Sequence, residues 1–365
     1  MLFAALAAAV SAVHTVAAGP RPQTLFQLGQ GELISAFAQD GARLAWFTPS
    51  NRGCNTVTLV QLGSVHETLP TMTAQNVTCR WDVVPPVRLA LATTSVLWTL
   101  REAAPPAPLP FDYVLGASSA DPKERRFFEV AHANGGAGLW LAGIAGDGTT
   151  LVYAVAIVDY VDEASCLSNP DVPGACALKI SSDGGGVHRI VGRQDNPIPQ
   201  TGPAVEVAVS GANVAYVPAA RIGPDGRPLP GPESIEIRAV ADGHAVGEVS
   251  PEGTPLAIAL SSTVLAAIER TPAGERLAWY RVDTGASGGS IPVPSGTSPE
   301  LSANDKFVVF RVGRSIRAVA VANRTVRTLA RAASTPIGLS IEGTRVAWAE
   351  NVGGHGRIRA IYLKG

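Results

Sequence analysis

The chain carries little charge and no excess of either sign. Its 365 residues include 29 Lys and Arg against 30 Asp and Glu, which gives a formal net charge of −1. Proteins that bind nucleic acid or anionic lipid through their electrostatic field have a basic surplus or a basic patch. We therefore expect no nucleic-acid partner.

Cysteine is also scarce, and the four cysteines are Cys54, Cys79, Cys166 and Cys176. None belongs to a C-x-x-C pair, and no two histidines have H-x-x-x-H spacing, so a structural zinc site is poorly supported. An even number of cysteines in loops favours disulfides instead. From the predicted layout of the loops we expect the pairs Cys54–Cys79 and Cys166–Cys176.

Long helical and long apolar segments are few. The 38 glycines and 28 prolines are spread along the chain, which favours short strands joined by tight turns, while 46% hydrophobic residues allow a large core. Residues 1–18 are apolar, are interrupted by Ser11, His14 and Thr15, and end in small residues. This pattern predicts a secretory signal peptide, although no basic residue precedes it, and no membrane span once it is removed.

A short motif, an aliphatic residue, any residue and an aromatic, recurs after a polar or glycine turn. Six copies are complete, and Val264/Ala266 is a degenerate seventh: Leu44/Trp46, Val96/Trp98, Leu151/Tyr153, Val214/Tyr216, Val308/Phe310 and Val346/Trp348. An apolar run rich in Ala, Gly and Ser precedes each turn, a third run follows the motif, and a fourth run, such as HRIVG, usually comes after it. Seven equivalent hairpins are typical of a propeller rather than a sandwich.

The repeats predict an all-β fold, a β-propeller of about seven four-stranded blades, with six as the second choice. Residues 19–365 form the single domain, and the N-terminal strand at residues 23–30 closes the ring as the outer strand of the last blade. The predicted blades cover residues 31–75, 81–134, 137–194, 201–252, 254–296, 297–332 and 333–365.

Three hairpins, AQDGARLAWF, AGDGTTLVYA and SIEGTRVAWA, resemble the repeats of the TolB-type propellers, relatives of the WD-repeat proteins. The resemblance covers about residues 31–365 and implies a propeller fold without implying a chemistry. The chain departs from that family in having seven apparent blades rather than six, no α/β domain before the propeller and no turn proline.

Loop length predicts where a ligand binds. If strands are lettered A to D from the channel outwards, the A–B turns are tight, whereas the B–C and D–A connections of blades 1–4 are long. Long loops on a rigid scaffold often carry function, although Pro-rich insertions can also be merely decorative. The candidate binding residues on this long-loop face are Arg80, Trp81, Asp159, Tyr160, Asp162 and Glu163.

Two motifs that could indicate catalysis or calcium binding lack the surrounding sequence that such sites need. Gly285–Gly289 matches G-x-S-x-G, but no helix can follow it, so Ser287 is not expected to be a nucleophile. Asp159, Asp162 and Glu163 lack the spacing of a calcium loop. We assign no catalytic, cofactor-binding or metal-binding residue and predict no cofactor.

The hypothesis from the sequence is a monomeric, non-enzymatic binding scaffold outside the cytoplasm, either secreted, periplasmic or attached to the cell wall. Its ligand would be a protein or a glycan of the cell envelope. The Ala-rich composition and the preference for Arg over Lys suggest a bacterial source. The alternative is a propeller hydrolase or lactonase with a metal or carboxylate site at the central channel, whose residues come from separate blades and leave no contiguous motif.

Overall fold

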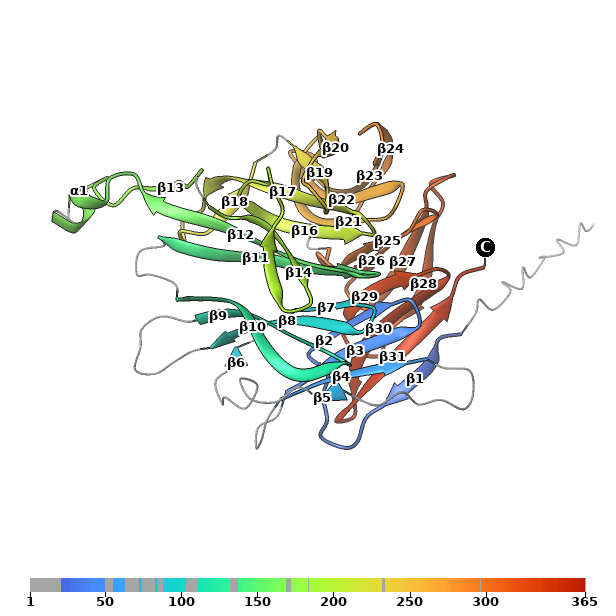
Figure 1. The fold of residues 1–365 in the computed structure, drawn as a ribbon. Coiled ribbons are helices and arrows are strands. Elements are labelled where there is room, and N and C mark those ends of the chain that lie inside the picture. Colours follow the sequence, from blue (N-terminus) through green and yellow to red (C-terminus); the bar gives the residue numbers. More distant parts are fainter. Residues whose placement is uncertain are drawn as a thin grey trace, which may run out of the picture.

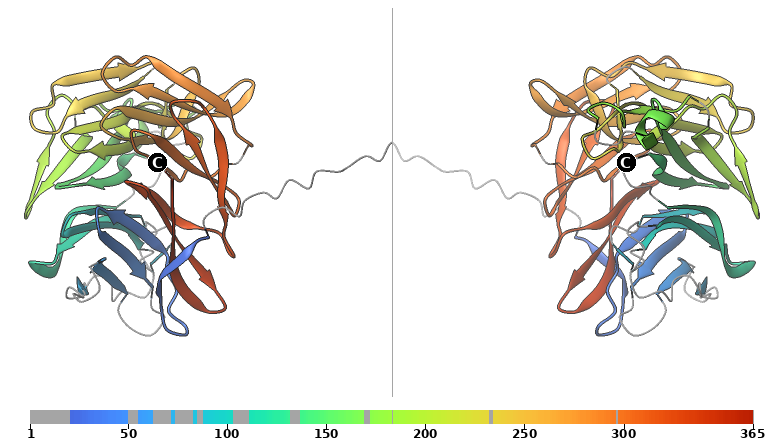
Figure 2. Two further views of the ribbon diagram at one scale, coloured as in Figure 1. Left: turned by 90° about the vertical axis from the view of Figure 1, so that its right-hand side faces the viewer. Right: turned by 90° about the vertical axis from the view of Figure 1, so that its left-hand side faces the viewer.

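The computed structural model describes residues 21–364 except 50–54, 63–71, 74–82, 85–87, 103–110, 132–136, 169–171, 183, 232–233 and 296. Seven antiparallel sheets follow one another around a ring in chain order (Figure 2). Among the described residues the one helix is α1, Glu163–Ser168. The predicted all-β, seven-bladed propeller is confirmed.

Blades 1 to 6 take their strands in sequence order from the channel outwards, and blade 7 takes its outer strand from the N-terminus. Blades 1 to 3 contain β2 Ala36–Asp40, β3 Arg43–Thr48, β4 Thr56–Gln61 and β5 Met72–Thr73; then β6 Val83–Val84, β7 Leu89–Ala92, β8 Ser95–Glu102, β9 Phe111–Ser118 and β10 Asp121–Ala131; then β11 Gly138–Asp147, β12 Thr150–Tyr160, β13 Leu178–Ile180, β14 Gly186–Val191 and β15 Gln194–Pro197.

Blades 4 to 7 have the same plan. They contain β16 Ala204–Ser210, β17 Asn213–Ile222, β18 Pro228–Pro230, β19 Ile235–Ala239 and β20 Ala245–Val249; β21 Thr254–Leu260, β22 Val264–Thr271, β23 Gly274–Arg281 and β24 Ser287–Pro292; β25 Leu301–Ala303, β26 Phe307–Val312, β27 Ser315–Ala320 and β28 Val326–Arg331; and β29 Ile337–Glu342, β30 Arg345–Val352 and β31 His355–Tyr362.

The N-terminal strand closes the ring. β1, Gln23–Gln27, pairs antiparallel with β31 and becomes the fourth strand of blade 7. The pairing continues beyond β1, where the Leu28 amide donates to the Gly356 carbonyl over 2.8 Å. Figure 2 shows the blue N-terminal strand beside the red C-terminal blade. This closure covers the edge that β31 would otherwise expose.

The recurring aromatics fill the spaces between blades. Trp98, Tyr153, Tyr216, Phe310 and Trp348 on the B strands are all fully buried. Blade 5 has Ala266 at the corresponding position, and Trp279 stands opposite it on the neighbouring strand β23. Both residues belong to the core cluster between blades 5 and 6. Blade 5 therefore has its bulky ring on the third strand instead of the second, and the ring still fills the core between blades 5 and 6.

The seven A strands contact one another in turn and line a central channel of about 610 Å³. Small side chains such as Ala38, Ala208, Ala259 and Ser302 form much of its wall. The crowding of seven strands around one axis explains the Ala-, Gly- and Ser-rich composition of these runs.

One strand assignment was wrong. The run HRIVG was expected as a fourth strand, but it lies in β14, which pairs with β12 in the third position, and β15 is the outer strand. The third strand is interrupted between β13 and β14, where Gly184 and Gly185 adopt positive φ values of 86° and 76°. These glycines allow the backbone to leave and rejoin the sheet.

Several predictions lie outside the described residues: the signal peptide at residues 1–18, and Cys54, Cys79, Arg80 and Trp81. Within the part of the chain that the structure describes, no helix is long and apolar enough to cross a membrane.

Candidate functional site

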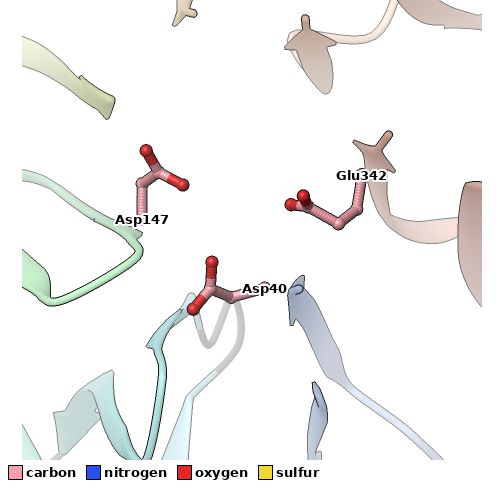
Figure 3. Close-up of side chains that lie close together, drawn as sticks. All are labelled: Asp40, Asp147 and Glu342. Carbon is pink, nitrogen blue, oxygen red and sulfur yellow. The ribbon is translucent and has the colours of Figure 1, made fainter. Parts of the chain in front are cut away.

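Three carboxylates from three different blades meet at one end of the channel. Asp40 ends β2, Asp147 ends β11 and Glu342 ends β29, so each lies where an A strand enters its A–B turn. Their carboxylate oxygens come within 4.8 Å of one another, and the side chains point towards a common space (Figure 3). We call this end of the channel the turn mouth.

Two of these carboxylates also join neighbouring blades. Asp40 is buried and accepts hydrogen bonds from the amides of Thr93 in blade 2, at 2.6 Å, and Gly148 in blade 3, at 3.0 Å. Asp147 accepts from the Gly211 amide of blade 4 at 2.6 Å. Such charge-assisted bonds hold the turns in fixed positions around the channel.

Asp305 of blade 6 continues this pattern towards blade 5. Its carboxylate accepts from the hydroxyls of Ser261, Ser262 and Thr263 and from the Thr263 amide, at 2.7 to 3.1 Å. Asn304 donates to the Gly343 carbonyl of blade 7 at 2.7 Å. The A–B turns thus form a hydrogen-bonded belt from blade to blade.

The acids of the belt differ in their proton affinity. Burial raises the pKa of Glu342 above its usual value, and the charges of Asp40 and Asp147 raise it further, against the opposing Gly41 amide and Arg345. Burial alone would raise the pKa of Asp305, but the hydrogen bonds from Ser262, Ser261 and Thr263 outweigh it and lower that pKa. Glu342 therefore takes a proton more readily than an ordinary glutamate, and Asp305 less readily than an ordinary aspartate.

Chemically, the turn mouth can hold a hard cation or share a proton. Three convergent carboxylates provide the oxygen ligands that Ca²⁺ and Mg²⁺ prefer. Without a cation, protonation of Glu342, which its raised pKa favours, would reduce the repulsion within the group. The sequence alone did not identify these three residues as a site, because each belongs to a different repeat. The one available signal was an acid at the end of the strand before the turn in QDGA, GDGT and EGT.

The opposite end of the channel contains paired charges. Arg88 of blade 2 lies 3.7 Å from Glu206 of blade 4 and donates to the Ala142 carbonyl of blade 3. Glu300 accepts from Arg311 at 2.9 Å and from the Gly338 amide at 3.0 Å. Burial raises the pKa of Glu206, and Arg88 opposes that shift. These two carboxylates each lie within 4.0 Å of an arginine nitrogen, whereas none of the ion pairs found among the described residues involves Asp40, Asp147 or Glu342.

The long B–C connection of blade 3 forms a projecting arm, which the structure describes at residues 161–168 and 172–177. Its base is closed by the Val161 amide, which donates to the Ala177 carbonyl, and its two halves are joined by the Cys166–Cys176 disulfide. The helix α1 lies within it, and Figure 1 shows α1 beyond the edge of the blades. The predicted Cys166–Cys176 pair is confirmed.

The candidate binding residues of this region have different local roles. Asp159 and Tyr160 are half-buried at the end of β12 and lie opposite Lys179 and Leu178 of β13. Asp162 is exposed, and its carboxylate accepts from the Ser165 amide at 3.0 Å, which caps α1. Glu163, in the first turn, is exposed. The acidic character of the segment is thus explained in part by helix capping.

Exposed apolar side chains gather on the arm. Leu167 is 74% exposed, Val161 57% and Val172 55%, the three highest values among the large apolar residues that the structure describes. The four other exposed large apolar residues lie singly elsewhere: Leu33, Val191, Val326 and Tyr362. Three of the exposed large apolar residues thus lie on one cross-linked projection.

A Tyr–Asp–His network occupies blade 3. Tyr153 donates to Asp195 at 2.5 Å, His188 Nδ1 lies 3.0 Å from the other oxygen of Asp195, and the His188 ring stacks on Tyr153 at 4.8 Å. Burial, then Asp195, raises the pKa of Tyr153 well above its usual range. His188 lies within β14 and packs against Tyr153.

No protein-family model and no curated protein sequence matches the chain. Solved structures with a related fold include the propeller domain of a trilobed protease from Pyrococcus furiosus, with 8% identity, a TM-score of 0.49 and coverage of 92% of this chain and 99% of that one. An uncharacterised protein of Listeria monocytogenes EGD-e has 9% identity, a TM-score of 0.47 and coverage of 89% and 90%. The designed protein Ika8 has 11% identity, a TM-score of 0.48 and coverage of 93% and 100%. None of these similarities bears on function.

Proposed function

We propose that the protein is an exported, non-enzymatic binding propeller that docks on a protein of the cell envelope through the described part of the arm, residues 161–168 and 172–177. The observation that carries the proposal is the exposure of Val161, Leu167 and Val172 on one projection that a disulfide holds together. Apolar side chains lose no hydrogen bonds to water when a protein covers them, and the disulfide limits the entropy that the arm loses on binding.

Other features support this reading. The exposed residues are aliphatic, which suits a protein surface better than a sugar ring, the usual partner of an aromatic platform. A disulfide is typical of oxidising compartments outside the cytoplasm. Close by, Arg227 of the blade 4 hairpin stacks over Trp140 of β11, 5.8 Å from the ring centroid, and links blades 3 and 4. We also propose, from the turn motifs alone, that the protein is related to the TolB-type propellers.

The test compares tagged proteins isolated from the cells that naturally produce the chain. The double variant Leu167→Ser, Val172→Ser removes the apolar contacts, and Val326→Ser on β28 is the matched control. We expect a partner protein that co-purifies with wild type and control to fall at least about tenfold in the double variant, since two such contacts exceed 1.4 kcal/mol. Equal recovery with all three proteins would contradict the proposal.

A second candidate function is the binding of a divalent cation at the turn mouth, as in the alternative of a propeller hydrolase or lactonase. The observation that favours it is the convergence of Asp40, Asp147 and Glu342 within 4.8 Å. A bound cation would offset the repulsion between Glu342 and the neighbouring carboxylates, and it would stabilise the charged form of Glu342 despite its burial. It would also lie at the mouth of a channel, where a substrate could reach it.

Calcium titration tests this second function. If the site is real, 1 mM CaCl₂ raises the thermal midpoint of the wild type by several degrees, because a ligand that binds only the folded state stabilises it. Glu342→Gln should lose that response, whereas Glu248→Gln, an exposed residue of β20, should keep it. A wild type that does not respond to calcium, magnesium, manganese or zinc would eliminate the cation site.

A further inference from the structure

A second cavity lies on the turn side of the molecule, between blades 2 and 3 and away from the channel. Its volume is about 690 Å³. The A–B and C–D turns of both blades form its rim, so it faces away from the arm, which belongs to a B–C connection. Cavities of 300 to 1,000 Å³ are typical of small-molecule sites.

The walls combine an apolar floor with two arginines. Leu97, Leu151 and Ile190 come from the core cluster between these blades, and Phe127 packs against that cluster. Gly116 leaves room for the Phe127 ring, since a Cβ there would lie 2.7 Å from Phe127 Cε2. The flat ring therefore forms part of the cavity surface.

The two arginines come from opposite walls and share one carboxylate. Arg125 of β10 and Arg193 of the β14–β15 turn both donate through Nη2 to the same oxygen of Asp121, at 2.6 and 2.7 Å. Their hydrogen bonds hold the pKa of Asp121 at about 2, so the local sum is two positive charges against one negative. Each guanidinium has five N–H donors, and the Asp121 contacts use only one on each.

Thr93, in the wall of the cavity, has an unusual backbone conformation. In four other blades a glycine adopts the positive φ of the A–B turn: Gly41, Gly148, Gly211 and Gly343, at 54° to 56°. Blade 2 has Thr93 there at φ 49°, a conformation that β-branched residues rarely adopt. The Thr93 hydroxyl donates to the Gly148 carbonyl, a link between blades that glycine could not make. Strain retained at one position of a repeat is a frequent feature of functional sites.

We propose that this cavity between blades 2 and 3 binds a small organic anion, with its carboxylate on Arg125 and Arg193 and its apolar body against Phe127. Guanidinium groups bind carboxylates through paired N–H donors, and Asp121 keeps both side chains oriented before the ligand arrives. The net positive charge of the rim favours the anion over a neutral molecule of the same shape.

The test is isothermal titration of the full chain with 4-phenylbutyrate and its neutral analogue 4-phenylbutanamide. We expect one site per chain, with the amide at least about tenfold weaker, or about 1.4 kcal/mol, because the neutral amide cannot make charge-assisted hydrogen bonds to the two arginines. Arg193→Gln and Phe127→Ala should each weaken phenylbutyrate binding about fivefold or more. Arg331→Gln, an exposed arginine of β28, should leave it unchanged.

Several results would overturn the proposal. These are the absence of saturable binding at millimolar phenylbutyrate, equal affinity for acid and amide, or variants at Arg193 and Phe127 that bind as wild type. Inorganic phosphate is the second probe, and if it bound as tightly as phenylbutyrate the apolar wall would have no role and the organic-anion class would be wrong. Thermal unfolding of each variant shows whether a loss of binding reflects the site or the fold.

Discussion

The carboxyl groups of this propeller differ in pKa because their immediate neighbours differ. Asp305 accepts four hydrogen bonds and has a lowered pKa, whereas Glu342 faces two other acids in a partly buried position and has a raised one. Both lie in the same belt of A–B turns. Asp305 lies in the turn, one position beyond the strand end that Glu342 occupies, and the neighbours that each acid meets there set its pKa.

The raised pKa of Glu342 has a consequence for stability. A carboxyl with a higher pKa in the folded protein than in the unfolded chain stabilises the fold when protonated, and that contribution is lost as the pH rises through the folded value. Without a cation, Glu342→Gln should be as stable as wild type near pH 4 and more stable at pH 8. Urea unfolding at both values, with Glu248→Gln as control, measures this difference. A variant less stable than wild type at pH 8 would show that the charged form of Glu342 stabilises the fold.

At the scale of the elements, blade 5 shows how a repeat tolerates a defect. Its B strand has Ala266 where the other blades have an aromatic residue, and Trp279 on β23 fills the space from across the strand pair. We expect Trp279→Ala to cost about 3 to 5 kcal/mol, the usual loss for a fully buried aromatic. The partly exposed Trp140 is the control, and Trp140→Ala should cost less than half as much in urea unfolding.

The arm should behave as a local unit. Its disulfide spans ten residues beyond the end of β12 and joins no two blades. Cys166→Ser with Cys176→Ser should therefore leave the thermal midpoint within about 2 °C of wild type, since local openings need not involve global unfolding. Amide hydrogen exchange should rise strongly at residues 161–177 and not in the blades. A large drop in the midpoint would mean that the arm supports the whole propeller.

The sequence could predict where most strands lie, but it could not predict which residues meet across the ring. The aliphatic–x–aromatic motif located six B strands, and the turn before Val264 located the seventh, because packing between blades demands the same pattern every time. HRIVG was misplaced because Gly184 and Gly185 interrupt one strand and imitate a turn between two. The group Asp40, Asp147 and Glu342 was missed because the ring brings together residues that are far apart in the chain.

At the scale of the whole molecule, closure by β1 should control stability. Without Gln23–Gln27 the edge of β31 is unpaired, and blade 7 loses the contacts of Phe26 and Leu25 with its core cluster. A chain lacking residues 23–27 should melt at least about 5 °C lower than one starting at residue 21, the equivalent of roughly 2 kcal/mol. It should also self-associate through the open edge, measurable by light scattering. An unchanged midpoint would contradict a closing role for β1.

The two sides of the propeller have different features. The turn side contains the hydrogen-bonded belt and the cavity between blades 2 and 3, and the loop side contains the disulfide-linked arm. This separation allows a macromolecular partner on one side while the other remains accessible. It also means that the arm and the cavity can be tested by independent variants.

The measurement that tests the proposed function most directly is site-specific photo-crosslinking at Leu167 in the cells that produce the protein, with the same photoreactive residue at Val326 as control. The proposal predicts one discrete adduct of higher mass at position 167 and none at position 326. No adduct at 167, or the same adducts at both positions, would show that the arm does not dock on a specific protein.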